Sequence, residues 1–96
     1  MTTVKMKGTP RFPKRTPPNN FTGAILDEVA KERWRQLQLW GEQFHEPDRW
    51  LAILMEEVGE TAQAQNEQKR AEYRKEMIQV AAVAVAAIEA LDKQND

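Results

Sequence analysis

Apolar residues recur at helical spacing in three stretches of the chain, and no stretch shows the alternation typical of a strand. In the first stretch, Ile25, Val29 and Leu37 follow a period close to 3.6 residues. Pro47 begins the second stretch and suits the first turn of a helix. The sequence therefore predicts an all-α protein with helices over about residues 24–40, 47–66 and 72–92.

The segments between these stretches are short and polar. Gly41 is a suitable end for the first helix, and residues 41–47 form a loop. Residues 67–71 make a brief connection between the second and third helices. Because so short a connection favours antiparallel neighbours, we expect a helical hairpin with the N-terminal helix packed beside it.

The third predicted helix is apolar on nearly every side from Met77 to Leu91. A helix of that kind is buried on every side, and two other helices of a short chain cannot cover it. Its many alanine and valine residues would allow close approach of another helix. We therefore predict a homo-oligomeric helical bundle, a dimer or a tetramer, with this helix at the interface.

Residues 1–22 differ in composition from the rest of the chain. They hold four of the five prolines and five of the 14 basic residues, and no acid. This pattern predicts an extended basic arm, followed by a helical domain over residues 23–96. Such an arm is either a solvated tail or packing strap, or a segment that binds phosphate or a partner.

Composition narrows the class of protein. The net charge is −1, which gives no general attraction to nucleic acid, so we expect no nucleic-acid partner. There is no cysteine, which excludes disulfide and thiol chemistry. The longest apolar run, residues 80–88, is too short to span a membrane, and no signal peptide is evident. A soluble cytoplasmic protein is expected.

Three glutamates, Glu56, Glu57 and Glu60, interrupt the apolar second helix. At 100° per residue, Glu57 borders the apolar stripe, Glu60 lies one step further out and Glu56 is the most peripheral. Glu76 and Gln79 project to one side of the third helix, which the hairpin would bring near the acids. Carboxylates beside apolar surface favour neutralisation by Mg²⁺, or by Mn²⁺, while the alternative is a solvated acidic face.

This arrangement resembles the MazG-like all-α nucleoside triphosphate pyrophosphohydrolases, of the small phage and bacterial type. The resemblance covers about residues 24–92. It rests on an acidic pattern in the second and third helices and on a segment of the first helix: Glu56-Glu57-Val58-Gly59-Glu60, Glu76-Met77-Ile78-Gln79, Glu32-Arg33-Trp34-Arg35-Gln36 and Trp40-Gly41-Glu42-Gln43.

The resemblance implies an oligomeric enzyme that hydrolyses nucleoside triphosphates to monophosphate and pyrophosphate with Mg²⁺. It assigns Glu57, Glu60 and Glu76 as metal ligands. Gln79 occupies a further ligand position, where the family pattern has aspartate. Glu56 matches an extra acid that serves a further metal or orients water, so Glu56, Glu57 and Glu60 form the candidate catalytic set.

Residues with suitable chemistry for the substrate lie on the first and third helices. Trp34 and Trp40 could stack on a base, although a core position is the alternative for any of the three tryptophans. Four basic residues could bind phosphates or simply face solvent: Lys31, Arg35, Arg74 and Lys75. A different class of function, a non-catalytic helical oligomerisation or binding module, stays open because Gln79 removes one charge from the expected ligand set.

Overall fold

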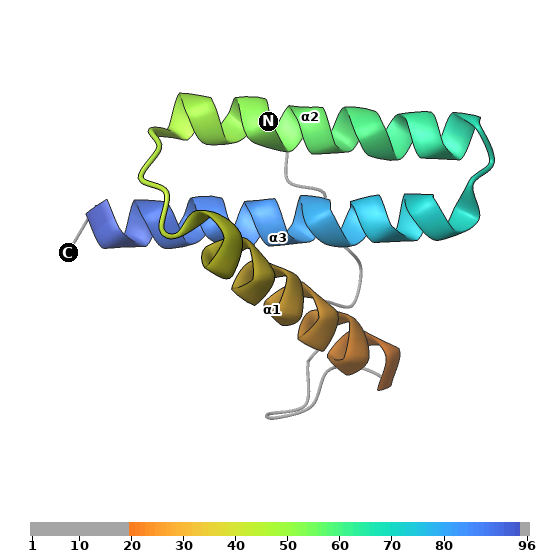
Figure 1. Cartoon of the computed structure of the whole chain (residues 1–96), viewed down its shortest axis with the longest axis horizontal. Coiled ribbons are helices and arrows are strands. Elements are labelled where there is room, and N and C mark those ends of the chain that lie inside the picture. Colours follow the sequence, from red (N-terminus) through yellow and green to blue (C-terminus); the bar gives the residue numbers. More distant parts are fainter. Residues whose placement is uncertain (1–19, 95–96) are drawn as a thin grey trace, which may run out of the picture.

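The computed structural model describes residues 20–94, which form three helices (Figure 1). The helices are α1 (Asn20–Trp40), α2 (Pro47–Asn66) and α3 (Arg70–Gln94). Over these residues the regular secondary structure is all helix, with no strand, which confirms the predicted all-α class. The predicted basic arm lies outside the described residues except at its end.

The limits of α2 agree with the prediction, whereas α1 and α3 are longer than expected. α1 begins at Asn20, so Phe21 and Thr22 belong to a helix and not to the arm. After Pro18 no further proline interrupts this segment, and the single Gly23 costs the helix only about 1 kcal/mol. α3 begins at Arg70, so the connection from α2 is only residues 67–69.

The contacts at the two ends of α2 explain why the sequence predicts where this helix begins and ends. Pro47 occupies its first turn, where a missing N–H costs nothing, and the Glu46 carbonyl accepts hydrogen bonds from the N–H groups of Arg49 and Trp50. At the other end the Lys69 N–H donates to the Ala64 carbonyl at 2.9 Å. Gln68 adopts a left-handed conformation with φ of 57°, which turns the chain sharply into α3.

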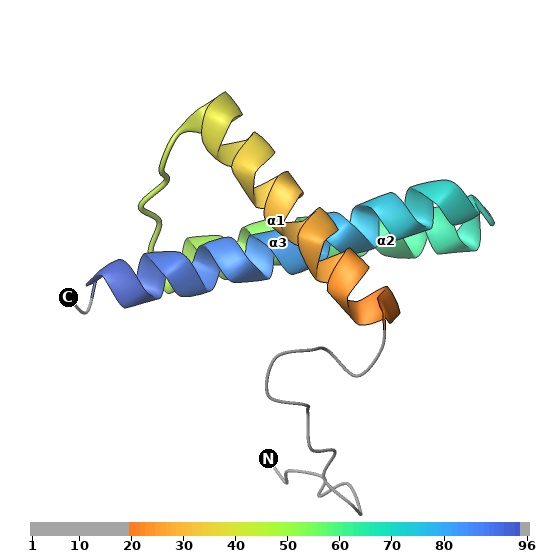
Figure 2. The ribbon, with the colours of Figure 1, turned by 90° about the horizontal axis from the view of Figure 1, so that it is seen from below.

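α3 is the central element. α2 runs beside it in the opposite direction, and α1 crosses it obliquely (Figures 1 and 2). Both α1 and α2 pack on α3, and α1 does not pack on α2. A buried cluster joins α2 to α3 and consists of Trp50, Val83, Ala86 and Ala90, with Ile53, Leu54 and Ala87 packed against it. The alanines let the two helices approach closely.

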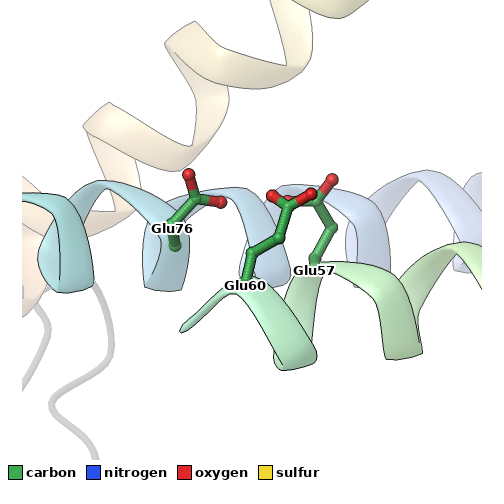
Figure 3. Close-up of side chains that lie close together, drawn as sticks. All are labelled: Glu57, Glu60 and Glu76. Atoms are coloured by element: carbon green, nitrogen blue, oxygen red, sulfur yellow. The ribbon is translucent and has the colours of Figure 1, made fainter. Parts of the chain in front are cut away.

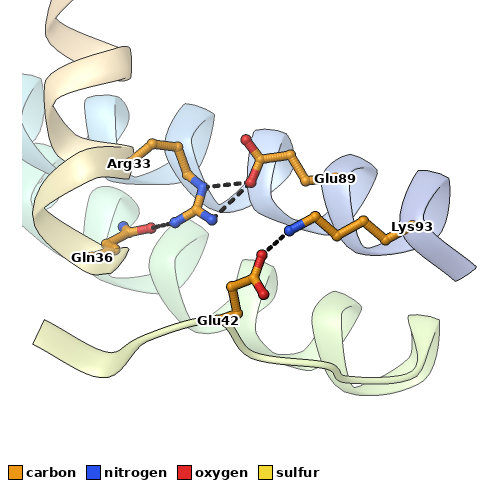
Figure 4. A network of polar contacts seen from close by, with 5 residues as sticks. All are labelled: Arg33, Gln36, Glu42, Glu89 and Lys93. Carbon is orange, nitrogen blue, oxygen red and sulfur yellow. Dashed lines mark hydrogen bonds and ion pairs between the residues drawn. The ribbon is translucent and has the colours of Figure 1, made fainter. Parts of the chain in front are cut away.

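Ion pairs hold α1 and the following loop to α3. The Arg33 guanidinium donates to Glu89 at 2.8 Å, and Lys93 pairs with Glu42 of the loop (Figure 4). Arg74 also donates to Glu28. Gly41 ends α1 with φ of +69°, and its N–H donates to the Leu37 carbonyl at 2.8 Å. Polar contacts therefore help to hold α1 across α3, where Val29 is the one buried hydrophobic side chain among the described residues of α1.

A single chain leaves much apolar surface uncovered. Leu51 and Met55 on α2 are about 60% exposed, as is Ile88 on α3. On α3, the residues that one chain buries are Ala82, Val83, Ala86 and Ala90. None of the described helices combines the length and apolar character needed to cross a membrane.

Candidate metal centre

The structure brings three of the predicted ligands together. Glu57 and Glu60 lie one turn apart on α2, and Glu76 lies opposite them on α3. Each offers a carboxylate oxygen, and these oxygens all lie within 4.8 Å of one another. Figure 3 shows the three carboxylates projecting to the same side of the α2 and α3 pair. We call this set the carboxylate cluster.

Two members of the carboxylate cluster are partly buried without the partners that buried oxygens require. Glu57 and Glu76 each have one buried carboxylate oxygen, Oε2, that accepts no hydrogen bond. A buried acceptor without a partner costs about 1–3 kcal/mol, and more when it is charged. The residues therefore fit a divalent cation. Such an ion would coordinate these oxygens and would also offset the repulsion between the three carboxylates.

The pKa values of two glutamates in the carboxylate cluster reflect this unfavourable placement of negative charge. Burial, reinforced by the charges of Glu60 and Glu76, raises the pKa of Glu57 to about 7. Burial and the neighbouring Glu60 also raise the pKa of Glu76 above its ordinary value. Without a cation, the cluster therefore tends to hold protons near neutral pH, and a bound cation would have to displace them.

The metal-free protein is expected to be more stable at pH 5.5 than at pH 8. The pKa of Glu57 is about 7 in the folded state against 4.5 for an ordinary glutamate, so folding favours the protonated form. That stability is complete below pH 4.5 and is lost as the pH rises through 7. Screening of a partly exposed group limits the difference to about 1–2 kcal/mol.

Urea unfolding in the presence of a chelator, at both pH values, measures this difference. A stability that is equal at the two pH values, or higher at pH 8, would contradict the account of Glu57.

The predicted catalytic acid Glu56, the predicted fourth ligand Gln79 and the predicted stacking residue Trp34 are not members of the carboxylate cluster. Glu56 is exposed and is not among the grouped oxygens. Gln79 is half-buried on α3, one turn after Glu76, and lines two cavities described below. Trp34 is 63% exposed and lines neither of these cavities.

The four predicted basic residues converge on one cavity between α1 and α3. This basic cavity has a volume of about 630 Å³, and its charged lining residues are Lys31, Arg35, Arg74, Lys75, Glu28 and Glu32. Arg74 donates to Glu28, and Arg35 to Glu32, at 2.8 Å each. Lys31 and Lys75 form no ion pair within 4.0 Å among the described residues, although the charge of Lys31 acts on Glu28 and that of Lys75 on Glu32 and Glu76.

A second cavity lies between α1, the loop after it, and the α2 and α3 pair. This aromatic cavity has a volume of about 250 Å³ and includes Trp40, Phe44 and Trp50 in its lining. Its polar lining includes Arg33, which donates to Glu89 and to Gln36 (Figure 4). Glu57 also lines it, so the aromatic cavity adjoins the carboxylate cluster.

The sequence reasoning missed most of this aromatic cavity. Arg33 and Gln36 follow the buried Val29 at the spacing i+4 and i+7, so they share its side of α1. From that spacing alone, the sequence could have predicted that Arg33 and Gln36 face α3. Their partner Glu89 lies 56 residues from Arg33, and no local pattern connects the two.

Comparison with family models, with curated proteins and with solved structures gives no match.

Proposed function

We propose that this protein is a Mg²⁺-dependent hydrolase that converts nucleoside triphosphates to monophosphates and pyrophosphate. The observation that carries the proposal is the carboxylate cluster with its two unpartnered buried oxygens. The sequence resemblance to MazG-like pyrophosphohydrolases supports the same reaction. In this proposal Glu57, Glu60 and Glu76 hold the cation, for which Mn²⁺ is a substitute.

A bound cation would neutralise phosphate charge and lower the pKa of water. The chain's own residues supply the rest of the chemistry. Glu60 is the exposed member of the cluster, so solvent reaches its carboxylate, which is our candidate to accept the proton of the attacking water. Lys31 and Lys75, at the basic cavity, would attract the phosphates.

The two cavities together suit a nucleotide. The basic cavity offers positive charge for a polyphosphate, and the aromatic cavity offers rings and hydrogen-bonding groups for a nucleoside. They are neighbours, because Glu32, Arg35 and Gln79 line both. A ligand with a charged part and a ring part would therefore occupy both cavities at once.

A pyrophosphate-release assay tests this function. The panel comprises ribo- and deoxynucleoside triphosphates, each with Mg²⁺ or Mn²⁺, and identifies the monophosphate product. We expect metal-dependent release of pyrophosphate from at least one of them. No turnover of any, together with no effect of either cation on thermal stability, would refute the enzyme.

One feature favours a second candidate, a non-catalytic helical binding module. Gln79 carries no charge at a position where the family pattern has an acid, and as a ligand it would make a weaker cation site than that pattern implies. Such a module would bind nucleotide or a partner without releasing pyrophosphate. The same assay, run beside a direct nucleotide-binding measurement, separates the two functions.

The proposal includes a homo-oligomer, a dimer or a tetramer. An apolar groove of about 250 Å³ runs between α2 and α3 and includes Leu51, Leu54, Ile88 and Leu91. The large exposed side chains around it would be covered in an interface between copies. The occupant of the groove would be the same surface of a second copy of this chain, because a two-fold interface is self-complementary.

The wild-type chain is expected to be oligomeric at micromolar concentration, and Ile88→Asp is expected to be monomeric, because a charge in the groove cannot be buried without a partner. Light scattering after size-exclusion chromatography measures both masses. Asp92→Asn, on the same helix, is the control and should keep the wild-type mass. A monomeric wild-type protein would contradict the prediction.

A further inference from the structure

Three side chains line both the basic and the aromatic cavity, and one of them is free. Glu32 and Arg35 are bonded to each other, with the Arg35 Nε and Nη2 atoms donating to the two Glu32 carboxylate oxygens at 2.9 and 2.8 Å. The Gln79 amide has no hydrogen-bond partner among the described residues. At the junction of the cavities, Gln79 is therefore the group available to a ligand.

Gln79 lies beside the carboxylate cluster on α3 but borders more of the two cavities than any member of that cluster. Three residues after Glu76, it lies about 60° around the helix from that side chain. Gln79 lines both cavities, Glu57 lines the aromatic cavity alone, and neither Glu60 nor Glu76 lines either one. Gln79 is thus the side chain next to the cluster that a ligand in both cavities would meet.

The chemistry of an amide suits this place. Its NH₂ group donates hydrogen bonds, and its carbonyl accepts them, without adding negative charge. A carboxylate at the same junction would repel a phosphate held by Lys31 and Lys75. Glutamine is therefore suited to contact an anionic substrate where the basic and aromatic cavities meet.

Trp50 carries a further polar group without a partner. Its side chain lines the aromatic cavity and also the apolar groove between α2 and α3, is only 7% exposed, and its indole N–H donates to no acceptor. A buried donor without a partner is costly, and a ligand with an acceptor atom, such as a base carbonyl or ring nitrogen, would satisfy it.

We infer that Gln79 is a substrate-contacting residue at the junction of the two cavities, and not a fourth ligand of the cation. The inference rests on the proposed function, because it takes the substrate to be a nucleotide. In this role the glutamine serves the substrate, and an aspartate at residue 79, as in the family pattern, would not improve the site. The amide donates to the phosphate or sugar oxygens that join the nucleoside to the polyphosphate.

Two separate measurements on Gln79→Ala and Gln79→Asp test this role. The first is Mn²⁺ affinity without nucleotide. The second is the affinity for the four α,β-imido deoxynucleoside triphosphates, which are not cleaved, at saturating Mg²⁺. Gln65→Ala, an exposed glutamine on α2 outside both cavities, is the matched control.

We expect Gln79→Ala to weaken binding of the analogue that the wild type prefers by about tenfold, because one hydrogen bond to a charged group is lost. Its Mn²⁺ affinity should stay within about twofold of the wild type, a change far smaller than one hydrogen bond. Gln79→Asp should weaken analogue binding further and should not tighten Mn²⁺ binding. The control should match the wild type in both.

Three results would overturn the inference: a loss of Mn²⁺ affinity in Gln79→Ala, tighter Mn²⁺ binding in Gln79→Asp, or analogue binding that neither variant changes. A wild-type chain that binds no analogue would overturn it as well. A wild-type chain that binds an analogue but releases no pyrophosphate would refute the proposed hydrolysis alone, and the variants would still decide the role of Gln79.

Discussion

Glu76→Gln is expected to lower pyrophosphate release by about 10³-fold, since the cation contributes several kcal/mol of charge stabilisation in the transition state. The substitution preserves the size of the side chain and removes one of the three charges of the carboxylate cluster. Without metal, the Glu76→Gln protein should be at least as stable as the wild type, because a neutral amide replaces a carboxyl that lies beside the charge of Glu60. Steady-state assays and urea unfolding measure the two effects.

Glu72→Gln is the matched control for this loss. Glu72 lies one turn earlier on the same helix, is exposed, and belongs to no group of converging carboxylates among the described residues. The control removes the same charge and should retain wild-type turnover. If Glu76→Gln kept full turnover, the carboxylate cluster would have no part in the reaction.

Glu57→Gln is expected to weaken binding of Mn²⁺ by at least about 100-fold, because it removes the innermost of the charged oxygens that a small cation requires. The same change should raise the stability of the metal-free protein at pH 8, since no buried charge remains at residue 57. Thermal unfolding with and without Mn²⁺ measures both quantities in one experiment.

The two effects of Glu57→Gln have opposite signs, which separates a ligand from a residue that only supports the fold. A packing defect would lower both stability and Mn²⁺ response. Higher stability with no Mn²⁺ response is the result that the account requires. Lower stability at pH 8, or an undiminished response to Mn²⁺, would show that Glu57 is not a ligand.

The helices could be predicted because strong local signals mark them. Pro47 fixes the start of α2, and a polar connection marks its end. The start of α1 was predicted four residues late, because Asn20 and Phe21 give no periodic signal and Gly23 suggests a break. α3 extends two residues further at each end than its apolar pattern, since polar residues also continue a helix.

The carboxylate cluster could be predicted from spacing and a short connection. Glu57 and Glu60 are one turn apart, and the turn at Gln68 returns the chain so that Glu76 faces them. The aromatic cavity could not be predicted from the sequence, because its shape depends on how α1 crosses α3. That crossing is held by pairs such as Arg33 with Glu89, which are far apart in the sequence.

The most direct test of the cation site is a titration of the wild-type chain with Mn²⁺, followed by electron paramagnetic resonance at pH 8 and at pH 6. We predict one Mn²⁺ ion per chain at pH 8. We expect binding weaker by about tenfold at pH 6, because the Glu57 carboxyl, with its pKa of about 7, must lose its proton first. Absence of binding at pH 8, or equal affinity at the two pH values, would contradict the account.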